Sequence, residues 1–301
     1  MLDGTSYRVF IEQGKQYIGI ASLTKGQRVV LPLLGDVRIR GTIRLVYYHD
    51  HFEIHTMTQV NVKKMSPGIK TMALDAGTTE VYTDQHDQRY GTNFGYILAK
   101  VDARMTDKGK KRNKIRDAAK NKALVDEKEH QAHLKKVRRH NLGKKKQDTR
   151  RTKARAAFAT EINHAINDVL EQGPQRVIVE DLRHMRGKAK SKKMSRHVSL
   201  WMRIVLTERL DFKTRARGSR LQAVASAYTS QECSHCGFTA KDNRKGDRFR
   251  CLFCGTVDTA DGNAAKVILK RATDPEIKPW MNTLQIKRIL DRRHIQITGK
   301  P

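Results

Sequence analysis

Four cysteines confined to one short stretch constrain this chain more than any other feature of its sequence. Cys233 and Cys236 form one Cys-x2-Cys pair, Cys251 and Cys254 form a second, and 14 residues separate the two pairs. Paired knuckles with this spacing bring four thiolates to one tetrahedral metal, as in a structural zinc ribbon. Four thiolates fill the coordination shell, so we predict one structural Zn²⁺ and give His235 no ligand role.

The residues around the cysteine pairs predict how the ribbon folds. Gly237 and Gly255 each follow the second cysteine of a pair, where a tight turn needs an unhindered backbone. Arg248-Phe249-Arg250 is predicted as a strand that leads into Cys251. No cysteine lies elsewhere to form a disulfide framework, which favours a reducing compartment. No apolar run reaches the length of a membrane helix and no signal-peptide pattern is present, so we expect a cytoplasmic protein without a membrane partner.

Residues 1–65 are predicted to be rich in β-structure. The stretch from Val37 to Leu45 alternates apolar and polar side chains, and Phe52-Glu53-Ile54-His55 repeats this period of two. Such alternation is typical of half-buried strands. His49-Asp50-His51, which lies between the two runs, is interpreted as a hairpin turn. We interpret the whole segment as part of a β-barrel or sandwich.

Beyond residue 65, short apolar runs and helical patterns follow one another. Residues 185–196 are basic and poor in apolar side chains, and are interpreted as a mobile loop. The other patterns predict an α/β core. Strands are expected at 70–74, 81–83, 176–179 and 221–224, with one more around 90–97, and helices at 158–170, 199–216 and 280–292.

The charge of the chain points to a polyanionic partner. Lys plus Arg number 61 against 31 Asp plus Glu, a formal net charge of +30, although a ribosomal or histone-like protein would show the same surplus. Residues 101–160 hold 21 Lys or Arg against 7 Asp or Glu and predict one or two long exposed helices. A solvated, partly disordered charge run is the alternative, but we favour ordering against nucleic acid. The predicted backbone contacts are Lys110, Lys111, Arg112, Lys135, Lys136, Arg138, Arg139, Lys144, Lys145 and Lys146.

Three carboxylates occupy positions that suit catalysis. Asp75 ends one apolar strand, Glu180 ends another, and Asp261 begins a helix just after the ribbon. A carboxylate at the end of a buried strand needs a partner, and a divalent cation is a suitable one. Two Mg²⁺ ions held by such groups can activate water and stabilise the leaving oxygen in phosphodiester cleavage. Each residue also has an ordinary alternative role, as turn former, ion-pair partner and helix N-cap respectively.

Together these motifs resemble the TnpB (OrfB-type transposase) family, which is related to the type V CRISPR effectors. The resemblance covers roughly residues 65 to 270. Its matching segments are Ala73-Leu74-Asp75-Ala76-Gly77, residues 177–182, residues 229–237, the second cysteine pair with Gly255, and residues 261–265. The resemblance implies that Asp75, Glu180 and Asp261 form the catalytic triad of an RNase H-like (RuvC) core with Mg²⁺. It also implies a zinc ion on the four cysteines, a guide RNA, a DNA target and a transposon-encoded origin.

Two features depart from the family's pattern. Family members usually begin with a longer N-terminal part that includes a helical recognition segment, so we expect this chain to be N-terminally truncated relative to them. The acidic-basic-acidic run often seen before Asn-Ala-Ala is Thr259-Ala260-Asp261 here, which retains only the catalytic carboxylate.

The predicted organisation has four parts. They are a partial wedge-type β-barrel at 1–65, a RuvC-like RNase H core at 66–228 and 256–273 with a basic helical insertion at 101–160, a zinc ribbon at 229–255, and a C-terminal tail at 274–301. The predicted function is that of an RNA-guided, Mg²⁺-dependent DNA endonuclease associated with transposition and DNA recombination. The first alternative is a non-cleaving nucleic-acid-binding remnant or regulator of the same family. The second, a zinc-ribbon RNA-binding protein, leaves Asp75 and Glu180 unexplained.

Overall fold

The computed structural model describes residues 1–35, 38–48, 51–57, 70–121, 126–182 and 205–299. The chain divides into two compact units, Met1–Asn61 and Val62–Pro301. Helices and strands both contribute, so the predicted mixed α/β class is confirmed. Among the described residues, no helix combines the length and the apolar character that crossing a membrane requires.

The first unit consists of two small antiparallel sheets. A backbone bridge between Leu2 and Ile43 joins the N-terminus to the second sheet, and a small cluster around Ile18 and Ile43 forms the core. The first sheet contains β1 (Tyr7–Glu12), β2 (Lys15–Ala21) and β3 (Arg28–Pro32), and the second contains β4 (Ile43–Tyr48) and β5 (His51–Thr56).

Two predictions for this unit need correction. The strand predicted from Val37 onward begins only at Ile43, because Gly41 adopts a left-handed φ of +71° that interrupts an extended backbone. His51 was assigned to a turn but is the first residue of β5, where it pairs with Tyr48. Val37, His49 and Asp50 lie outside the described residues, and the predicted strand around Phe52–His55 is confirmed by β5.

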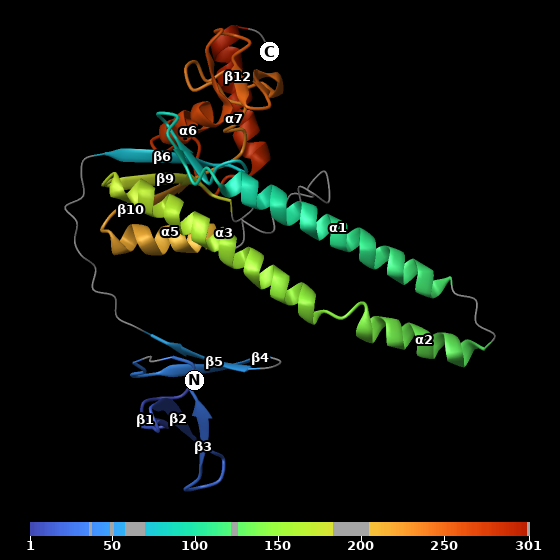
Figure 1. Cartoon of the computed structure of the whole chain (residues 1–301). Coiled ribbons are helices and arrows are strands. Elements are labelled where there is room, and N and C mark those ends of the chain that lie inside the picture. Colours follow the sequence, from blue (N-terminus) through green and yellow to red (C-terminus); the bar gives the residue numbers. More distant parts are fainter. Residues whose placement is uncertain (36–37, 49–50, 58–69, 122–125, 183–204, 300–301) are drawn as a thin grey trace. The chain divides into compact units, whose positions relative to one another are not determined.

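The second unit is built on a five-stranded sheet with the order β10-β9-β6-β7-β8 (Figure 1). The strands β6, β9 and β10 are parallel, and β7 and β8 extend the sheet in antiparallel fashion. The strands predicted at 70–74, 81–83, 176–179 and 221–224 are therefore confirmed. Their bounds are β6 (Thr71–Ala76), β7 (Tyr82–Asp84), β8 (Arg89–Tyr90), β9 (Arg176–Glu180) and β10 (Arg220–Val224).

The strand expected around residues 90–97 is confirmed only at Tyr90, and the prediction is wrong for the residues that follow. β8 ends at Tyr90, and a helix begins at Phe94. Phe94 and Leu98 are both buried, and their spacing of four places them on one face of a helix. Gly91, with a φ of +69°, turns the chain between the strand and the helix.

Residues 101–160 contain three helices where one or two were expected. A new helix starts after Asp126, whose side chain accepts a hydrogen bond from the Lys128 N–H group, and the chain turns again before Lys145. α1 and α3 extend away from the sheet, and α2 lies at the far end of this helical arm (Figure 1).

The long helices of the second unit have the following bounds in the described residues: α1 (Phe94–Lys120), α2 (Glu127–His140), α3 (Lys145–Glu171), α5 (Val205–Ala216), α6 (Ala260–Arg271) and α7 (Thr283–Thr298).

The last helix starts later than predicted, and two other predictions fall partly or wholly beyond the described residues. A capping box between Asn282 and Gln285 begins α7 at Thr283, three residues after Trp280. The helix predicted at 199–216 is described only from Val205 onward. The predicted loop at 185–196 lies outside the described residues.

Alternate residues of β6 face opposite sides of the sheet. Met72 and Leu74 pack in the main core with residues of α1, α3 and α5, whereas Ala73 packs against Ile268 of α6. Side chains of a strand alternate with a period of two, so Asp75 emerges on the same face as Ala73. The sheet therefore presents Asp75 to α6.

Gly91 provides a test of how tightly this unit is packed. A Cβ atom there would lie 2.5 Å from Val81 Cγ2 and 3.0 Å from Ala165 Cβ, at a left-handed φ. We expect Gly91→Ala to lower the free energy of unfolding by about 2–4 kcal/mol. Gly109→Ala in α1, where an added Cβ meets no atom within 4 Å, should raise it by about 0.5–1 kcal/mol. Urea unfolding followed by circular dichroism measures both, and equal effects would contradict the crowding at Gly91.

Candidate active site and metal centre

The four cysteines converge on one point. Their sulfur atoms all lie within 4.8 Å of one another, with 3.7 Å between the sulfurs of Cys233 and Cys254 and 3.6 Å between those of Cys236 and Cys251. A tetrahedral zinc with Zn–S bonds of about 2.3 Å places its sulfurs roughly 3.8 Å apart. The donor set therefore fits a metal such as zinc, and His235 is not part of the cluster.

The two knuckles are built alike. The Gly237 N–H donates to the Cys233 carbonyl (2.9 Å) and the Gly255 N–H donates to the Cys251 carbonyl (3.1 Å). Both glycines have left-handed φ angles, +81° and +76°, so the predicted tight turns are confirmed. The ribbon's three short antiparallel strands are β11 (Arg244–Lys245), β12 (Arg248–Arg250) and β13 (Val257–Thr259), and β12 is the strand predicted there.

The start of α6 fastens the ribbon to the core. The Thr259 hydroxyl caps the helix by accepting from the Gly262 N–H (3.1 Å), and a Cβ at Gly262 would lie 2.5 Å from that hydroxyl. Only glycine fits there. The buried Asn263 amide donates to the Glu232 carbonyl (2.8 Å) and accepts from the Ser234 N–H (2.9 Å). This motif therefore joins the first knuckle to the helix that carries Asp261.

Strand register brings two of the predicted carboxylates side by side. β6 and β9 are parallel and pair Leu74 with Val179, so the next residues, Asp75 and Glu180, are neighbours on adjacent strands. Ile178 packs with Ala73 on the α6 face, and alternation sends Glu180 to that same face. Asp261 lies in the first turn of α6, which packs over this face.

The three carboxylates influence one another electrostatically. Burial raises the pKa of Asp75 well above its usual value, and the negative charges of Glu180 and Asp261 raise it further. Burial also raises the pKa of Glu180. Among the described residues, the four cysteines are the group of three or more ligand-type side chains that lie close enough to hold a metal ion, and Asp75, Glu180 and Asp261 do not form such a group in this structure. Oxygen donors that repel one another in a buried setting are a suitable donor set for a hard cation such as Mg²⁺.

Sequence reasoning missed Arg244, which lies among these carboxylates. Its Nη2 atom is 2.9 Å from Asp261 Oδ1, and its positive charge lowers the pKa of both Asp75 and Glu180. Arg244 is one of several basic residues between the cysteine pairs, and no spacing singles it out. Arg244 lies on β11, which pairs with β12, and β12 pairs with β13. Because β13 leads directly into α6, this pairing brings Arg244 close to Asp261.

Two further residues near the site were not predicted. The buried Thr229 hydroxyl hydrogen-bonds the Glu180 carboxylate, which lowers the pKa of that carboxyl against the effect of burial. Glu80 is buried beside Arg89, and burial together with the charge of Asp261 raises its pKa although Arg89 opposes this. The only feature of the sequence that could have identified Thr229 is its place at the start of the matching segment 229–237. No feature of the sequence points to Glu80.

The predicted nucleic-acid contacts lie on the helical arm formed by α1, α2 and the first turn of α3. All of them are exposed except Arg112, which is half-buried. Arg112 instead donates to the carbonyls of Leu142 (2.6 Å) and Gly143 (3.3 Å) just beyond α2, so its contacts are structural. A cavity of about 480 Å³ adjoins it, and no acidic side chain is among its described lining residues. Its basic lining residues are Arg112, Arg116, Lys120, Arg138 and Lys144.

Known proteins match parts of this chain. The family model described as "Cas12f1-like, TNB domain" matches residues 205–268. A TnpB-like protein of Aquifex aeolicus (strain VF5) is 36% identical over 110 residues, which are 35% of this chain and 36% of that protein. "Putative RNA-guided DNA endonuclease InsQ" of Escherichia coli (strain K12) is 43% identical over 65 residues, 21% of this chain and 16% of that protein. "CRISPR-associated endodeoxyribonuclease Cas12f1" of Sulfoacidibacillus thermotolerans is 30% identical over 119 residues, 38% of this chain and 27% of that protein.

These matches cover well under half the length of each relative. The family model runs through α5, β10, the ribbon and the start of α6, so it contains all four cysteines, Arg244 and Asp261. The same region carries the zinc-type cluster and one of the three carboxylates. These segments of the chain are similar to the TnpB-type family, which is related to the type V CRISPR effectors.

Proposed function

We propose that this chain is an RNA-guided, Mg²⁺-dependent nuclease that hydrolyses DNA phosphodiester bonds. The main support is the convergence of Asp75, Glu180 and Asp261, from three separate segments, on one face of the sheet. The buried Asp75, repelled by the charges of the half-buried Glu180 and Asp261, does not stabilise the fold, whereas a bound cation would remove the repulsion. In this proposal the five-stranded sheet and its helices are an RNase H-like (RuvC) core, and the first unit is a partial wedge-type barrel.

Each residue of the site has a proposed role. Asp75, Glu180 and Asp261 would hold two Mg²⁺ ions, which supply a water nucleophile and stabilise the leaving oxygen. The Thr229 hydroxyl orients the Glu180 carboxylate, and Arg244 balances negative charge at Asp261. The zinc site, with four thiolates and no open position, has a structural role. It would hold Arg244 and the beginning of α6 in place.

The helical arm would bind the nucleic-acid backbone. Its exposed lysines and arginines suit phosphates, because each neutralised phosphate releases condensed counterions. The names of the relatives, an RNA-guided DNA endonuclease and a CRISPR-associated endodeoxyribonuclease, support a guide RNA and a DNA target. Arg112 is left out of this binding surface because its guanidinium is occupied by two carbonyls.

The proposal is tested by incubating labelled single-stranded DNA with the purified protein and its co-purifying RNA. Cleavage is measured with Mg²⁺ and in Mg²⁺-free buffer that contains trace Zn²⁺, so that omitting Mg²⁺ does not strip the ribbon. We expect cutting only with Mg²⁺. Tight binding without cutting in either buffer would contradict the nuclease and favour the non-cleaving alternative.

Arg244→Gln is expected to move the acidic limb of the pH–rate profile to higher pH. Arg244 lowers the pKa of Asp75 and Glu180, so its removal raises both pKa values. These groups must be ionised to hold Mg²⁺, and a higher pKa requires a more alkaline solution. Arg248→Gln, an exposed change on the adjacent strand β12, is the matched control and should leave the profile in place. If the acidic limb of the pH–rate profile stayed in place in Arg244→Gln, Arg244 would have no electrostatic role at the site.

A further inference from the structure

Arg271, in the last turn of α6, is a buried arginine with no part in the roles assigned above. Only 4% of it is exposed. Its Nη1 atom donates to the carbonyls of Ala225 (2.8 Å) and Ala227 (2.6 Å), and its Nη2 atom pairs with Glu232 (2.7 Å). These contacts fasten both ends of the turn at residues 225–232, which connects β10 to the first cysteine knuckle.

The turn that Arg271 holds contains a strained residue. Tyr228 has a φ of +66°, in the left-handed region that bulky residues avoid at a cost of about 1–3 kcal/mol. Such a conformation persists only where the surroundings enforce it. The N–H groups of Gln231 and Glu232 both donate to the Tyr228 carbonyl (2.9 and 3.0 Å), and Tyr228 packs against the apolar cluster that includes Leu290 of α7. The turn is therefore held by its own backbone hydrogen bonds, by Arg271 of α6 and by the apolar residues of α7.

Thr229, which follows the strained Tyr228, contacts the carboxylate of Glu180. Thr229 is only 3% exposed, and its hydroxyl lies within hydrogen-bond distance of the Glu180 carboxylate and, at 3.0 Å, of the Ser226 carbonyl. A hydroxyl has one proton, and an ionised carboxylate can only accept. The Ser226 carbonyl also can only accept, but an ionised Glu180 is the stronger, charged acceptor, so it receives this hydrogen bond, which restrains the direction of its oxygens.

We infer that Arg271 is a positioning residue for Glu180, acting through the turn at 225–232 and the hydroxyl of Thr229. The inference rests on the proposed function, because it treats Glu180 as a metal ligand. Residues that hydrogen-bond a metal ligand orient it, and their loss typically weakens metal affinity by about 10- to 100-fold. The described hydrogen bonds of Arg271 do not reach Glu180 and instead hold the segment that carries Thr229.

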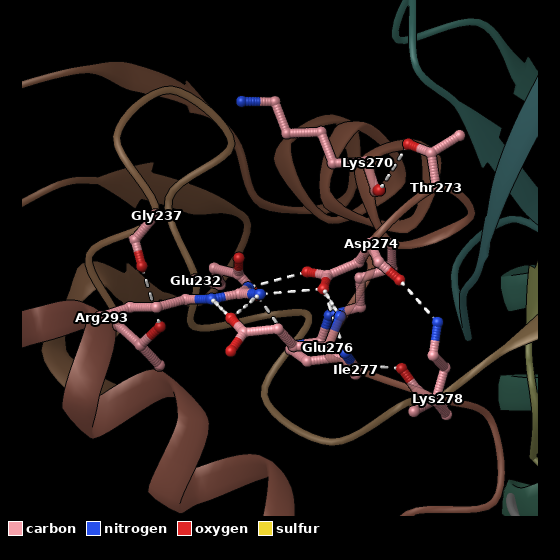
Figure 2. Close-up of polar contacts among 12 residues, drawn as sticks. Glu232, Gly237, Lys270, Thr273, Asp274, Glu276, Ile277, Lys278 and Arg293 are labelled. Carbon is pink, nitrogen blue, oxygen red and sulfur yellow. Dashed lines mark hydrogen bonds and ion pairs between the residues drawn. The ribbon is translucent and has the colours of Figure 1, made fainter.

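A half-buried arginine with ion pairs of its own provides a comparison. Arg293 of α7 pairs with Asp274 (2.7 and 2.8 Å) and with Glu276 (3.0 and 2.7 Å), which ties α7 to the segment after α6 (Figure 2). None of its described hydrogen bonds reaches the turn at 225–232. Loss of Arg293 removes none of the hydrogen bonds that hold the turn and reaches it only through the packing of α7, so its effect on Glu180 should be smaller than that of losing Arg271.

The test measures Mn²⁺ binding to the full-length, zinc-loaded protein by electron paramagnetic resonance of free Mn²⁺, without nucleic acid. We expect Thr229→Val to weaken binding about 10- to 100-fold and Thr229→Ser to restore it. Arg271→Gln should weaken binding similarly, and the double variant with Thr229→Val should lose less affinity than the sum of the two single losses, because both act through Thr229 and only the direct effect of the Arg271 charge on Glu180 is added. Arg293→Gln should lower Tm and reduce Mn²⁺ affinity clearly less than Arg271→Gln does. If Arg271→Gln does not fold, Glu232→Gln, which removes only its ion pair, takes its place.

The outcomes separate this inference from the proposed function. Asp75→Ala is measured alongside, and binding that survives in it would overturn the carboxylate site together with the inference. If Asp75→Ala loses Mn²⁺ while Thr229→Val binds like the wild type, only the positioning role fails. Additive losses in the double variant, or an equal loss of affinity in Arg293→Gln, would also overturn it, since both indicate general loosening.

Discussion

Asp75→Asn is expected to abolish DNA cleavage and, at the same time, to raise the thermal stability of the metal-free protein. Asp75 is buried, and burial with the charges of Glu180 and Asp261 raises its pKa well above the usual range. A carboxyl whose pKa is raised by folding favours the folded state at low pH and opposes it as pH rises toward the raised value. At neutral pH the neutral amide removes this repulsion while keeping the shape of the side chain.

The loss of cleavage follows from the same change. An amide cannot replace the anionic oxygen that holds a divalent cation, so we expect the single-turnover rate to fall by roughly a thousandfold or more, about 4 kcal/mol in activation free energy. Differential scanning calorimetry in Mg²⁺-free buffer should show a Tm increase of about 2–4 °C for each kcal/mol gained. Binding of nucleic acid, measured by filter retention, should not change.

Asp211→Asn provides the control for both measurements. Asp211 lies on α5 and forms an i,i+4 ion pair with Arg215 (2.9 Å), an exposed contact of small energetic value. We expect neither Tm nor cleavage to change appreciably. If Asp75→Asn lost binding and cleavage in parallel, or lowered Tm, then Asp75 would be a structural residue and the proposed site would have to be abandoned.

The elements that the sequence predicted well are those whose pattern reflects burial. The strands at 70–74 and 176–179 each contain a continuous apolar run, at 72–74 and 177–179, as expected for strands covered on both faces, and both were located correctly. A carboxylate directly after such a run identified Asp75 and Glu180 as candidates. Their proximity to each other depends on the parallel register of β6 and β9, which no local pattern determines.

The failures have local or long-range physical causes. The apolar residues after Tyr90 were assigned to a strand, but Phe94 and Leu98 bury the same face of a helix. Arg112 was counted among phosphate contacts because of its charge, whereas its position opposite the end of α2 commits it to two carbonyls. Arg244 was overlooked because only the pairing of the ribbon strands brings it to Asp261.

The ribbon connects the metal cluster to the proposed catalytic site. It contributes Arg244 directly, and its first knuckle is fastened to α6 by Asn263. Its strands are two or three residues long, and its core consists of Phe249, Phe238 and three of the cysteines. So small a core cannot offset the entropy of ordering this segment, and a metal bound by the four cysteines would supply the difference.

Cys251→Ser is therefore expected to eliminate cleavage, although Cys251 is not among the carboxylates. Structural zinc contributes about 10–16 kcal/mol of binding free energy to small domains of this kind, and a serine hydroxyl is a poor replacement for a buried thiolate. Without the metal, the ribbon should unfold, Arg244 should leave Asp261, and the arm should still bind nucleic acid.

Three measurements on Cys251→Ser check this expectation beside His235→Ala, which alters a residue inside a knuckle but outside the sulfur cluster. Elemental analysis should show that zinc is lost from Cys251→Ser and retained by His235→Ala. Trypsin should cut near Lys241 and Lys245 in the first variant only, because a protease needs a locally unfolded backbone and these exposed lysines lie in folded structure while the ribbon is intact. Cleavage should fall about 100-fold or more in Cys251→Ser and persist in His235→Ala, since losing Arg244 and the anchored start of α6 removes more than roughly 3 kcal/mol of transition-state stabilisation. A zinc-free Cys251→Ser that still cleaved DNA would show that the carboxylates act independently of the ribbon, and would remove Arg244 from the mechanism.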